Sequence, residues 1–176
     1  MKKLGIGVGL IVAALAALAV ASYAVGGGGK KMVKADTLTG YQEATPAGVS
    51  SPATGSFEAT IDDVGTIDYT LSYTGLEAPT LFAHIHFGNR FTSGGVSVFL
   101  CGGGGKPACP TPGGTVSGTI TAADVIGPAG QGIEPGAFGE LVDAIRAGLT
   151  YVNVHSTKFP AGEIRGQIND ANQRQP

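Results

Sequence analysis

The stretch AHIHFG, residues 83–88, places two of the three histidines of the chain two residues apart. On an extended strand, residues two apart project from the same face, so His84 and His86 share one side and their apolar neighbours share the other. The third histidine, His155, ends the alternating segment TYVNVH. Neutral imidazole binds zinc and copper well, so three histidines on neighbouring strands could form a three-nitrogen metal site.

A hydrogen-bonded network is the alternative interpretation of the same residues, and it is the one we favour at this point. The segments YVNVH and GEIRGQI each carry their polar residues on the side opposite their valines or isoleucines. These polar residues are Tyr151, Asn153 and His155 in the first segment, and Glu163, Arg165 and Gln167 in the second. If the strands are neighbours, these side chains and the histidines build one shared polar surface, with Glu163 and Arg165 paired to neighbours.

Known catalytic motifs are missing from the sequence. It contains no G-x-S-x-G, no P-loop, no H-E-x-x-H and no G-x-G-x-x-G between a strand and a helix. Catalysis needs a positioned nucleophile or base with an orienting partner, and no such set is visible. We therefore expect that the protein is not an enzyme.

The two cysteines, Cys101 and Cys109, flank a glycine-rich loop in LCGGGGKPACP. Their C-x7-C spacing lacks the tight spacing of a zinc knuckle. In an exported chain, an even pair at short spacing predicts a disulfide that constrains the loop.

Several segments alternate with period two, as half-buried strands do. Residues 56–61 and 66–74 are two such runs, and Asp62-Asp63-Val64-Gly65 between them predicts a turn and an antiparallel hairpin. The pattern recurs in GVSVFL, TVSGTI, TYVNVH and GEIRGQI. With 30 glycines, 10 prolines and no tryptophan, the chain is expected to form an all-β antiparallel sandwich of seven or so strands, of the Greek-key or immunoglobulin-like type.

One segment has helical spacing instead. Within EPGAFGELVDAIRAG, Phe138, Leu141, Val142 and Ile145 recur as on one face of a helix, and Gly148 suits the stop. We expect a short amphipathic helix over one edge of the sandwich. A capping box beginning at Thr121 predicts another helical turn.

The N-terminus has the pattern of an export segment. Lys2 and Lys3 precede an apolar run from residue 4 to residue 25, and small residues suit cleavage after Ala21 or Ala24. An uncleaved membrane anchor is the alternative, because the run is long enough to span a bilayer. We therefore predict a signal segment over residues 1–24, a flexible Gly/Lys tether over 25–35, one domain over 36–170 and a frayed tail over 171–176.

The charge of the chain is mild. Eleven basic and 13 acidic residues give a formal net charge of −2, and the lysines and arginines are scattered. A nucleic-acid surface needs clustered cations to neutralise phosphates, so we expect no nucleic-acid partner.

The order of the motifs resembles the CHRD domain, first described in chordin and widespread in exported prokaryotic proteins. The resemblance is carried by LTGYQE with Pro46, by G-x-F at 55–57, by AHIHFG, by the cysteine loop, by VSGTITAADV, by AGLTYVNVH and by PAGEIRGQI. It covers nearly all of residues 36–169. The shared motifs point to Glu43, His84, His86, Asn153, His155, Glu163 and Arg165 as the positions that matter.

What this resemblance implies about function is limited. Animal members bind growth factors, but their cysteine-rich repeats are absent here, and single-domain prokaryotic members have no settled activity. There is a looser likeness to copper/zinc superoxide dismutases, whose sandwich carries an H-x-H strand. Three histidines cannot build that dinuclear site, whereas a mononuclear copper or zinc site is permitted.

Together these observations predict an exported structural or binding module outside the cytoplasm, held at the membrane only if its N-terminal anchor stays uncleaved. Its partner would be an unknown extracellular protein or surface component. The alternative is a metalloprotein that binds copper or zinc through His84, His86 and His155, with redox activity as a further option.

Overall fold

The computed structural model describes residues 30–44, 47–62 and 64–169. The expected export segment over residues 1–24, Pro46 and the expected tail over 171–176 lie outside the described residues. Within the described residues, no helix is both long and apolar enough to cross a membrane.

Eight strands form one continuous antiparallel sheet in the order β5-β4-β7-β8-β1-β2-β3-β6. Their bounds are β1 Lys31–Thr39, β2 Thr54–Ile61, β3 Ile67–Thr74, β4 Thr80–Phe87, β5 Gly95–Cys101, β6 Gly114–Ile120, β7 Thr150–Ser156 and β8 Ile164–Ile168. The all-β class expected from the alternating segments is confirmed.

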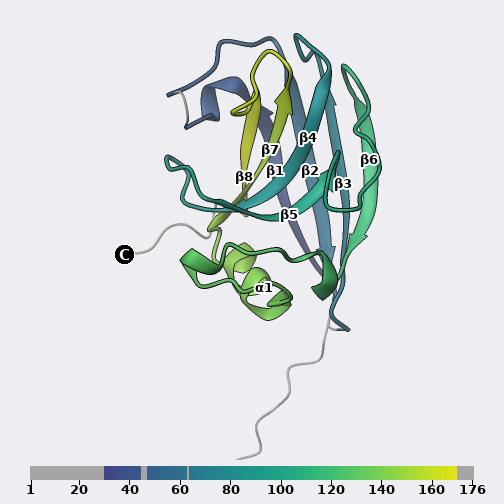
Figure 1. Cartoon of the computed structure of the whole chain (residues 1–176), viewed down its shortest axis with the longest axis vertical. Helices are drawn as coiled ribbons and strands as arrows, with labels where there is room; N and C mark the ends of the chain where they lie inside the picture. The colour runs from purple at the N-terminus through teal and green to yellow at the C-terminus, as the bar shows by residue number, and fades with distance from the viewer. Residues whose placement is uncertain (1–29, 45–46, 63, 170–176) are drawn as a thin grey trace, which may run out of the picture.

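The sheet curls over on itself into a nearly closed, sandwich-like body (Figure 1). One half contains β5, β4, β7 and β8, and the other contains β1, β2, β3 and β6. The halves join where Thr39 of β1 pairs with Arg165 of β8. Across the opposite side, the Tyr69 hydroxyl of β3 donates to the Leu100 carbonyl of β5 at 2.7 Å.

Period-two alternation produces the core between the halves. In β3, Ile67, Tyr69, Leu71 and Tyr73 are buried, while every second residue is exposed or half-buried. Burial of apolar surface at roughly 25 cal/mol per Å² is the main stabilising contribution in such a core. The predicted hairpin is confirmed, because β2 pairs with β3 in register from Thr54↔Thr74 to Ile61↔Ile67.

The expected tether is wrong at its C-terminal end. Residues 31–35 belong to β1, which pairs with β2 from Lys31↔Ile61 onwards. Val33 and Ala35 are buried in the core, so pairing with β2 and apolar burial order this basic segment. An irregularity between Ala35 and Leu38 shifts the register and breaks the alternation that would otherwise mark the strand.

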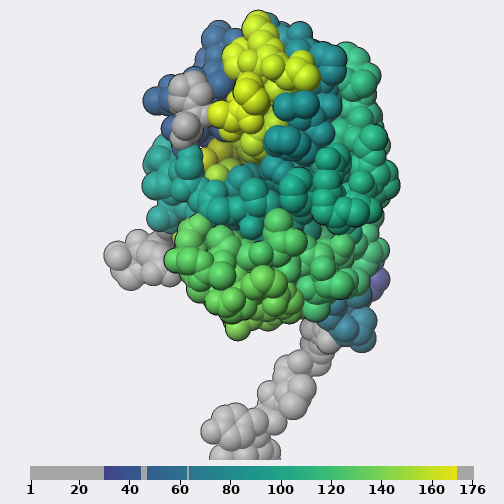
Figure 2. Space-filling view, in the orientation of Figure 1, coloured from purple at the N-terminus to yellow at the C-terminus, as the bar shows by residue number. Residues whose placement is uncertain are grey.

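The predicted helix is present as α1, Phe138–Arg146, with Leu141, Val142, Ala144 and Ile145 buried. It lies at one end of the folded sheet, and the space-filling view shows the green segment that carries it covering that end (Figures 1 and 2). The expected capping box is also present and begins the short 3-10 helix Ala122–Asp124. Two further 3-10 helices span Gly40–Gln42 and Ala129–Gln131.

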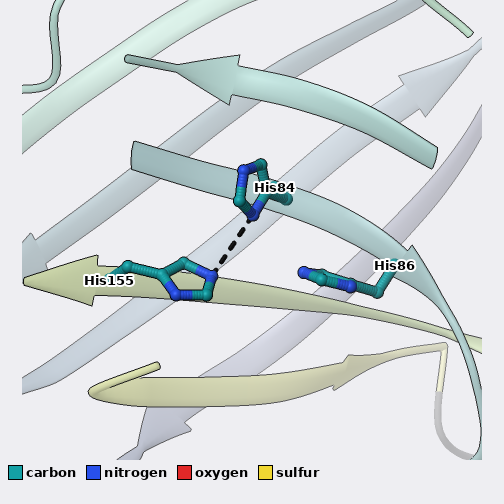
Figure 3. A group of neighbouring side chains, drawn as sticks. All are labelled: His84, His86 and His155. Atoms are coloured by element: carbon teal, nitrogen blue, oxygen red, sulfur yellow. Dashed lines mark hydrogen bonds between the residues drawn. The ribbon is translucent and has the colours of Figure 1, made fainter. Parts of the chain in front are cut away.

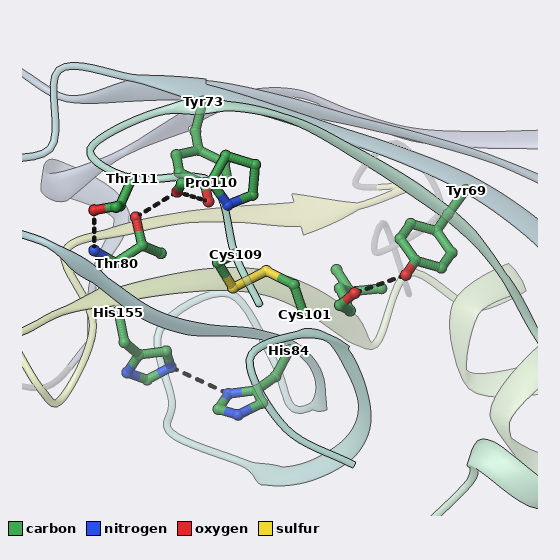
Figure 4. The surroundings of a disulfide bond; sticks show 10 residues. Tyr69, Tyr73, Thr80, His84, Cys101, Cys109, Pro110, Thr111 and His155 are labelled. Carbon is green, nitrogen blue, oxygen red and sulfur yellow. Dashed lines mark hydrogen bonds between the residues drawn. A yellow bond between two sulfur atoms is a disulfide. The ribbon is translucent and has the colours of Figure 1, made fainter. Parts of the chain in front are cut away.

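The predicted disulfide joins Cys101 at the end of β5 to Cys109. Pro110, the next residue, accepts hydrogen bonds from the hydroxyls of Tyr73 and Thr80, at 2.6 and 2.9 Å (Figure 4). The disulfide and these bonds together fasten the cysteine loop to both halves of the sandwich.

Candidate functional site: a buried polar layer with three histidines

The polar faces of β4, β7 and β8 lie side by side, as the sequence predicted. His84 is directly opposite Asn153, and His86 is directly opposite Tyr151, in the antiparallel pairing of β4 with β7. In the pairing of β7 with β8, Asn153 is opposite Arg165 and Tyr151 is opposite Gln167. We call this set the polar layer; its members are His84, His86, Tyr151, Asn153, His155, Glu163, Arg165 and Gln167, with Glu43 packed onto it.

The polar layer is buried, which corrects the expectation of a polar surface. Arg165 and Asn153 expose 2% and 3% of their area, and no member exposes more than 9%. The segment after β4 and the segment after β1 cover the layer and form hydrogen bonds with it. The Arg165 guanidinium donates to the carbonyls of Asn89 and Thr92, at 2.7 and 2.9 Å, and so holds the segment after β4 over the layer.

The three histidines form a compact cluster within this layer (Figure 3). One ring nitrogen from each lies within 4.8 Å of the others. His84 Nδ1 and His155 Nε2 are 3.2 Å apart, and the His86 ring points towards this pair. The Phe82 ring packs at a tilt against His84 and against His155, each at 4.7 Å between centroids, so the cluster has an apolar wall.

Backbone carbonyls fix which nitrogen carries the proton in two of the rings. His86 Nδ1 lies 2.9 Å from the Gly94 carbonyl, and His155 Nδ1 lies 3.0 Å from the Pro160 carbonyl. A carbonyl can only accept, so each neutral ring protonates Nδ1 and keeps the lone pair on Nε2. In metal sites the same arrangement orients a ligating imidazole.

Burial keeps these rings neutral. It lowers the pKa of His84 to about 3, together with smaller contributions from His155 and His86. The pKa of His155 falls to about 4, mainly through burial and against the raising effect of its bond to Pro160. Burial also lowers the pKa of His86. At neutral pH the cluster therefore offers lone pairs, which is the state that binds a metal ion.

Glu43 and Asn153 connect the layer to the segment that follows β1. Asn153 Nδ2 donates to Glu43 Oε1 at 2.7 Å. Burial raises the pKa of Glu43 to about 7, despite the opposing effects of this bond and of Arg165. Gly162, with φ +132°, passes close by, and a Cβ there would overlap both the Asn153 amide and the Glu43 carboxyl.

Glu163 has a separate set of partners at the edge of the layer. Its Oε1 accepts from the Ser51 hydroxyl at 2.7 Å and from the Glu77 backbone amide at 2.9 Å. The sequence predicted that Glu163 and Arg165 each pair with neighbours, and the two side chains have different partners. Arg165 lies over the Tyr151 ring at 3.4 Å, and Tyr151 stacks on His86.

Two exposed aromatic residues lie outside the layer, and no pattern in the sequence pointed to them. Tyr41 is 77% exposed and Phe91 is 85% exposed. Both line a pocket of about 340 Å³ that also includes Gln42, Glu43, Ala44, Ala47, Gly48 and Arg90. We call Tyr41 and Phe91 the aromatic rim. The loop that carries Tyr41 is bonded to the polar layer through Glu43, and the loop that carries Phe91 is bonded to it through Arg165.

Comparisons with known proteins give one match. The family model described as the CHRD domain matches residues 35–168. This range begins within β1 and ends with β8, so it includes all eight strands apart from the first residues of β1. No curated protein and no solved structure matches the chain.

Proposed function

Because the chain belongs to the CHRD domain family, we propose that it works outside the cytoplasm as a binding module for an extracellular protein or a surface component. The proposed location is supported by the Cys101–Cys109 disulfide, since such bonds persist in oxidising compartments. The export segment predicted over residues 1–24 agrees with it.

The observation that carries this proposal is the aromatic rim. Large exposed aromatic side chains are unfavourable in water and are enriched at binding interfaces, where they supply much of the binding energy. The buried polar layer holds the rim loops in place, so a partner would meet a surface that is already ordered.

The test compares binding of the purified, labelled domain to intact cells of its source. We expect saturable binding that falls at least about tenfold in a Tyr41→Ser/Phe91→Ser variant. Val64→Ser is the matched control, because Val64 is 87% exposed at the turn between β2 and β3, away from the rim. Equal binding by all three proteins, or no saturable binding by any of them, would contradict the proposal.

A second candidate function is metal binding, and the geometry of the cluster favours it. We infer that His84 Nδ1, His86 Nε2 and His155 Nε2 bind copper or zinc. Zn–N bonds of about 2.0 to 2.1 Å place tetrahedral ligand nitrogens about 3.3 Å apart. The 3.2 Å separation of the His84 and His155 nitrogens suits this arrangement.

Elemental analysis and titration of the purified protein with Zn²⁺ and with copper test this candidate. We expect near one equivalent of one metal in the wild type and its loss in a His84→Ala/His86→Ala variant. Gln167→Glu is the control, since Gln167 is also buried in the layer but lies on β8, two strands away from β4. A wild type that binds neither metal would exclude the site.

A further inference from the structure

Four buried acceptor atoms in the polar layer lack a hydrogen-bond donor among the described residues: Glu163 Oε2, Gln167 Oε1, His86 Nε2 and Asn153 Oδ1. The last two belong to side chains that contact each other beside the histidine cluster. The orientation of each is fixed from its other end. His86 Nδ1 donates to the Gly94 carbonyl, and Asn153 Nδ2 donates to Glu43. Turning the Asn153 amide over would set its oxygen against the Glu43 carboxylate, and moving the His86 proton to Nε2 would set a lone pair against the Gly94 carbonyl. An unpaired buried acceptor is unfavourable, so we expect a partner for these two atoms.

Asn153 is placed to share that partner with the histidines. It lies directly opposite His84 across the β4–β7 pairing, where side chains are typically about 4.5–5.5 Å apart at Cβ. On β7 it shares a face with His155, two residues further on. The Asn153 side chain also contacts His86 and raises the pKa of that ring, against the larger lowering by burial.

The missing partner is a proton, a water molecule or a cation. A second proton on His86 would bond only to Asn153, and it would bury a positive charge in the layer that already holds the Arg165 guanidinium. A water molecule could donate to His86 and Asn153, but the nitrogens of His84 and His155 would gain nothing from it. A cation accepts lone pairs from all four atoms once the proton shared between His84 Nδ1 and His155 Nε2 moves to His84 Nε2.

We propose that Asn153 Oδ1 is the fourth donor to a metal ion held by His84, His86 and His155. The inference rests on the metal-binding candidate above and adds an oxygen ligand to it. Three nitrogens and one oxygen fill the four positions of a tetrahedral zinc site. The Glu43 carboxyl, which accepts from Asn153 Nδ2, orients the amide so that its oxygen faces the cluster.

The experiment measures Zn²⁺ affinity of the purified protein by competition with a chromophoric chelator, in the wild type and in two Asn153 variants. Asn153→Asp is made together with Glu43→Gln, so that a donor remains between the two side chains. It keeps an oxygen at the cluster and adds negative charge, so it should bind Zn²⁺ at least about tenfold more tightly. Asn153→Leu keeps the approximate shape and removes the oxygen, so it should bind at least about tenfold more weakly. A purely structural role for Asn153 would weaken binding in both.

Gln167→Glu is the matched control, since it makes the same amide-to-carboxylate change in the same layer, on β8. It should change Zn²⁺ affinity much less than Asn153→Asp does. Co²⁺ supplies a second readout: its visible spectrum should report the loss of a ligand in Asn153→Leu and no change in Gln167→Glu.

The outcomes separate this inference from the candidate function. If the wild type binds no metal, both are overturned. If binding is lost in His84→Ala/His86→Ala but neither Asn153 substitution moves Zn²⁺ affinity or the Co²⁺ spectrum, the histidine site stands and the fourth ligand is wrong.

Discussion

The largest fully buried side chain among the described residues belongs to Arg165. A buried guanidinium is costly unless its donors are matched and its charge is compensated. Here two carbonyls, of Asn89 and Thr92, accept from it, and the Tyr151 ring lies against its face at 3.4 Å. Arg165 therefore joins β8 to the segment after β4, and that segment carries Phe91 of the aromatic rim.

Replacing Arg165 should destabilise the protein strongly. Arg165→Met removes two charge-assisted bonds and the stacking on Tyr151, and we expect a loss of about 2–4 kcal/mol in the free energy of unfolding, measured with urea. Arg165→Lys keeps the charge without the planar fork and should recover only part of that loss. Lys34→Met, at an exposed ion pair with Asp36, is the control and should leave stability unchanged. A Met variant as stable as the control would contradict this role.

The histidine cluster predicts a loss of stability in acid. The folded-state pKa values of His84 and His155, about 3 and about 4, lie below the ordinary value of 6.5, so unfolding takes up protons. Stability is then complete above about pH 6.5 and falls as the pH drops towards these values, with a slope of at most about 1.4 kcal/mol per pH unit for each ring. Urea unfolding with chelator present should show this slope, and His155→Gln should reduce it. A flat profile from pH 7 to pH 4 would contradict the prediction.

The Glu43 carboxyl should make the free energy of unfolding depend on pH in the opposite direction. Its pKa is raised from 4.5 to about 7, so its contribution is complete below about pH 4.5 and is lost as the pH rises through 7. Glu43→Gln keeps the acceptor for Asn153 but cannot ionise. Relative to the wild type, the variant should gain on the order of 3 kcal/mol between pH 4.5 and pH 8. Parallel pH profiles for the two proteins, again with chelator present, would show that Glu43 does not titrate in this way.

At the scale of single elements, local patterns were enough wherever a partner lay close in sequence. The β2–β3 hairpin follows from alternation on both sides of a turn in which Asp62 Oδ1 accepts from the amides of Val64 and Thr66. The helix α1 follows from its apolar spacing and begins at Phe138. β1 was missed because its basic residues suggested a tether, and pairing with β2 together with core burial overrides that composition.

The cysteine loop is an element whose stabilisation can be tested alone. Closing the nine residues from Cys101 to Cys109 should stabilise the protein by about 2.5 kcal/mol, through lost entropy of the unfolded chain. A Cys101→Ala/Cys109→Ala variant should lose about that amount in urea unfolding. The reduced wild type is the matched control and should resemble the variant. No difference between oxidised and reduced wild type would contradict the estimate.

At the scale of the whole molecule, the sequence predicted which polar side chains meet but not that they are buried. Alternation in β4, β7 and β8 was sufficient to bring His84, Asn153 and Arg165 onto one face. Their cover comes from residues 40–44, 47–49 and 88–94, whose paths depend on bonds between residues 70 or more positions apart, such as Arg165 to Thr92. No local pattern carries that information, and the same is true of the aromatic rim.

Cover on both faces gives β7 and β8 a property that the other half of the sandwich lacks. Every residue of β7 and of β8 is buried, whereas β3 alternates between buried residues and exposed or half-buried ones. In a saturation mutagenesis library selected for folded protein, β3 should accept varied residues at alternate positions such as Asp68 and Thr70. In β7 and β8, no set of alternate positions should accept varied residues. Tolerated substitutions in the sheet should therefore fall mainly in the half of the sandwich that contains β3.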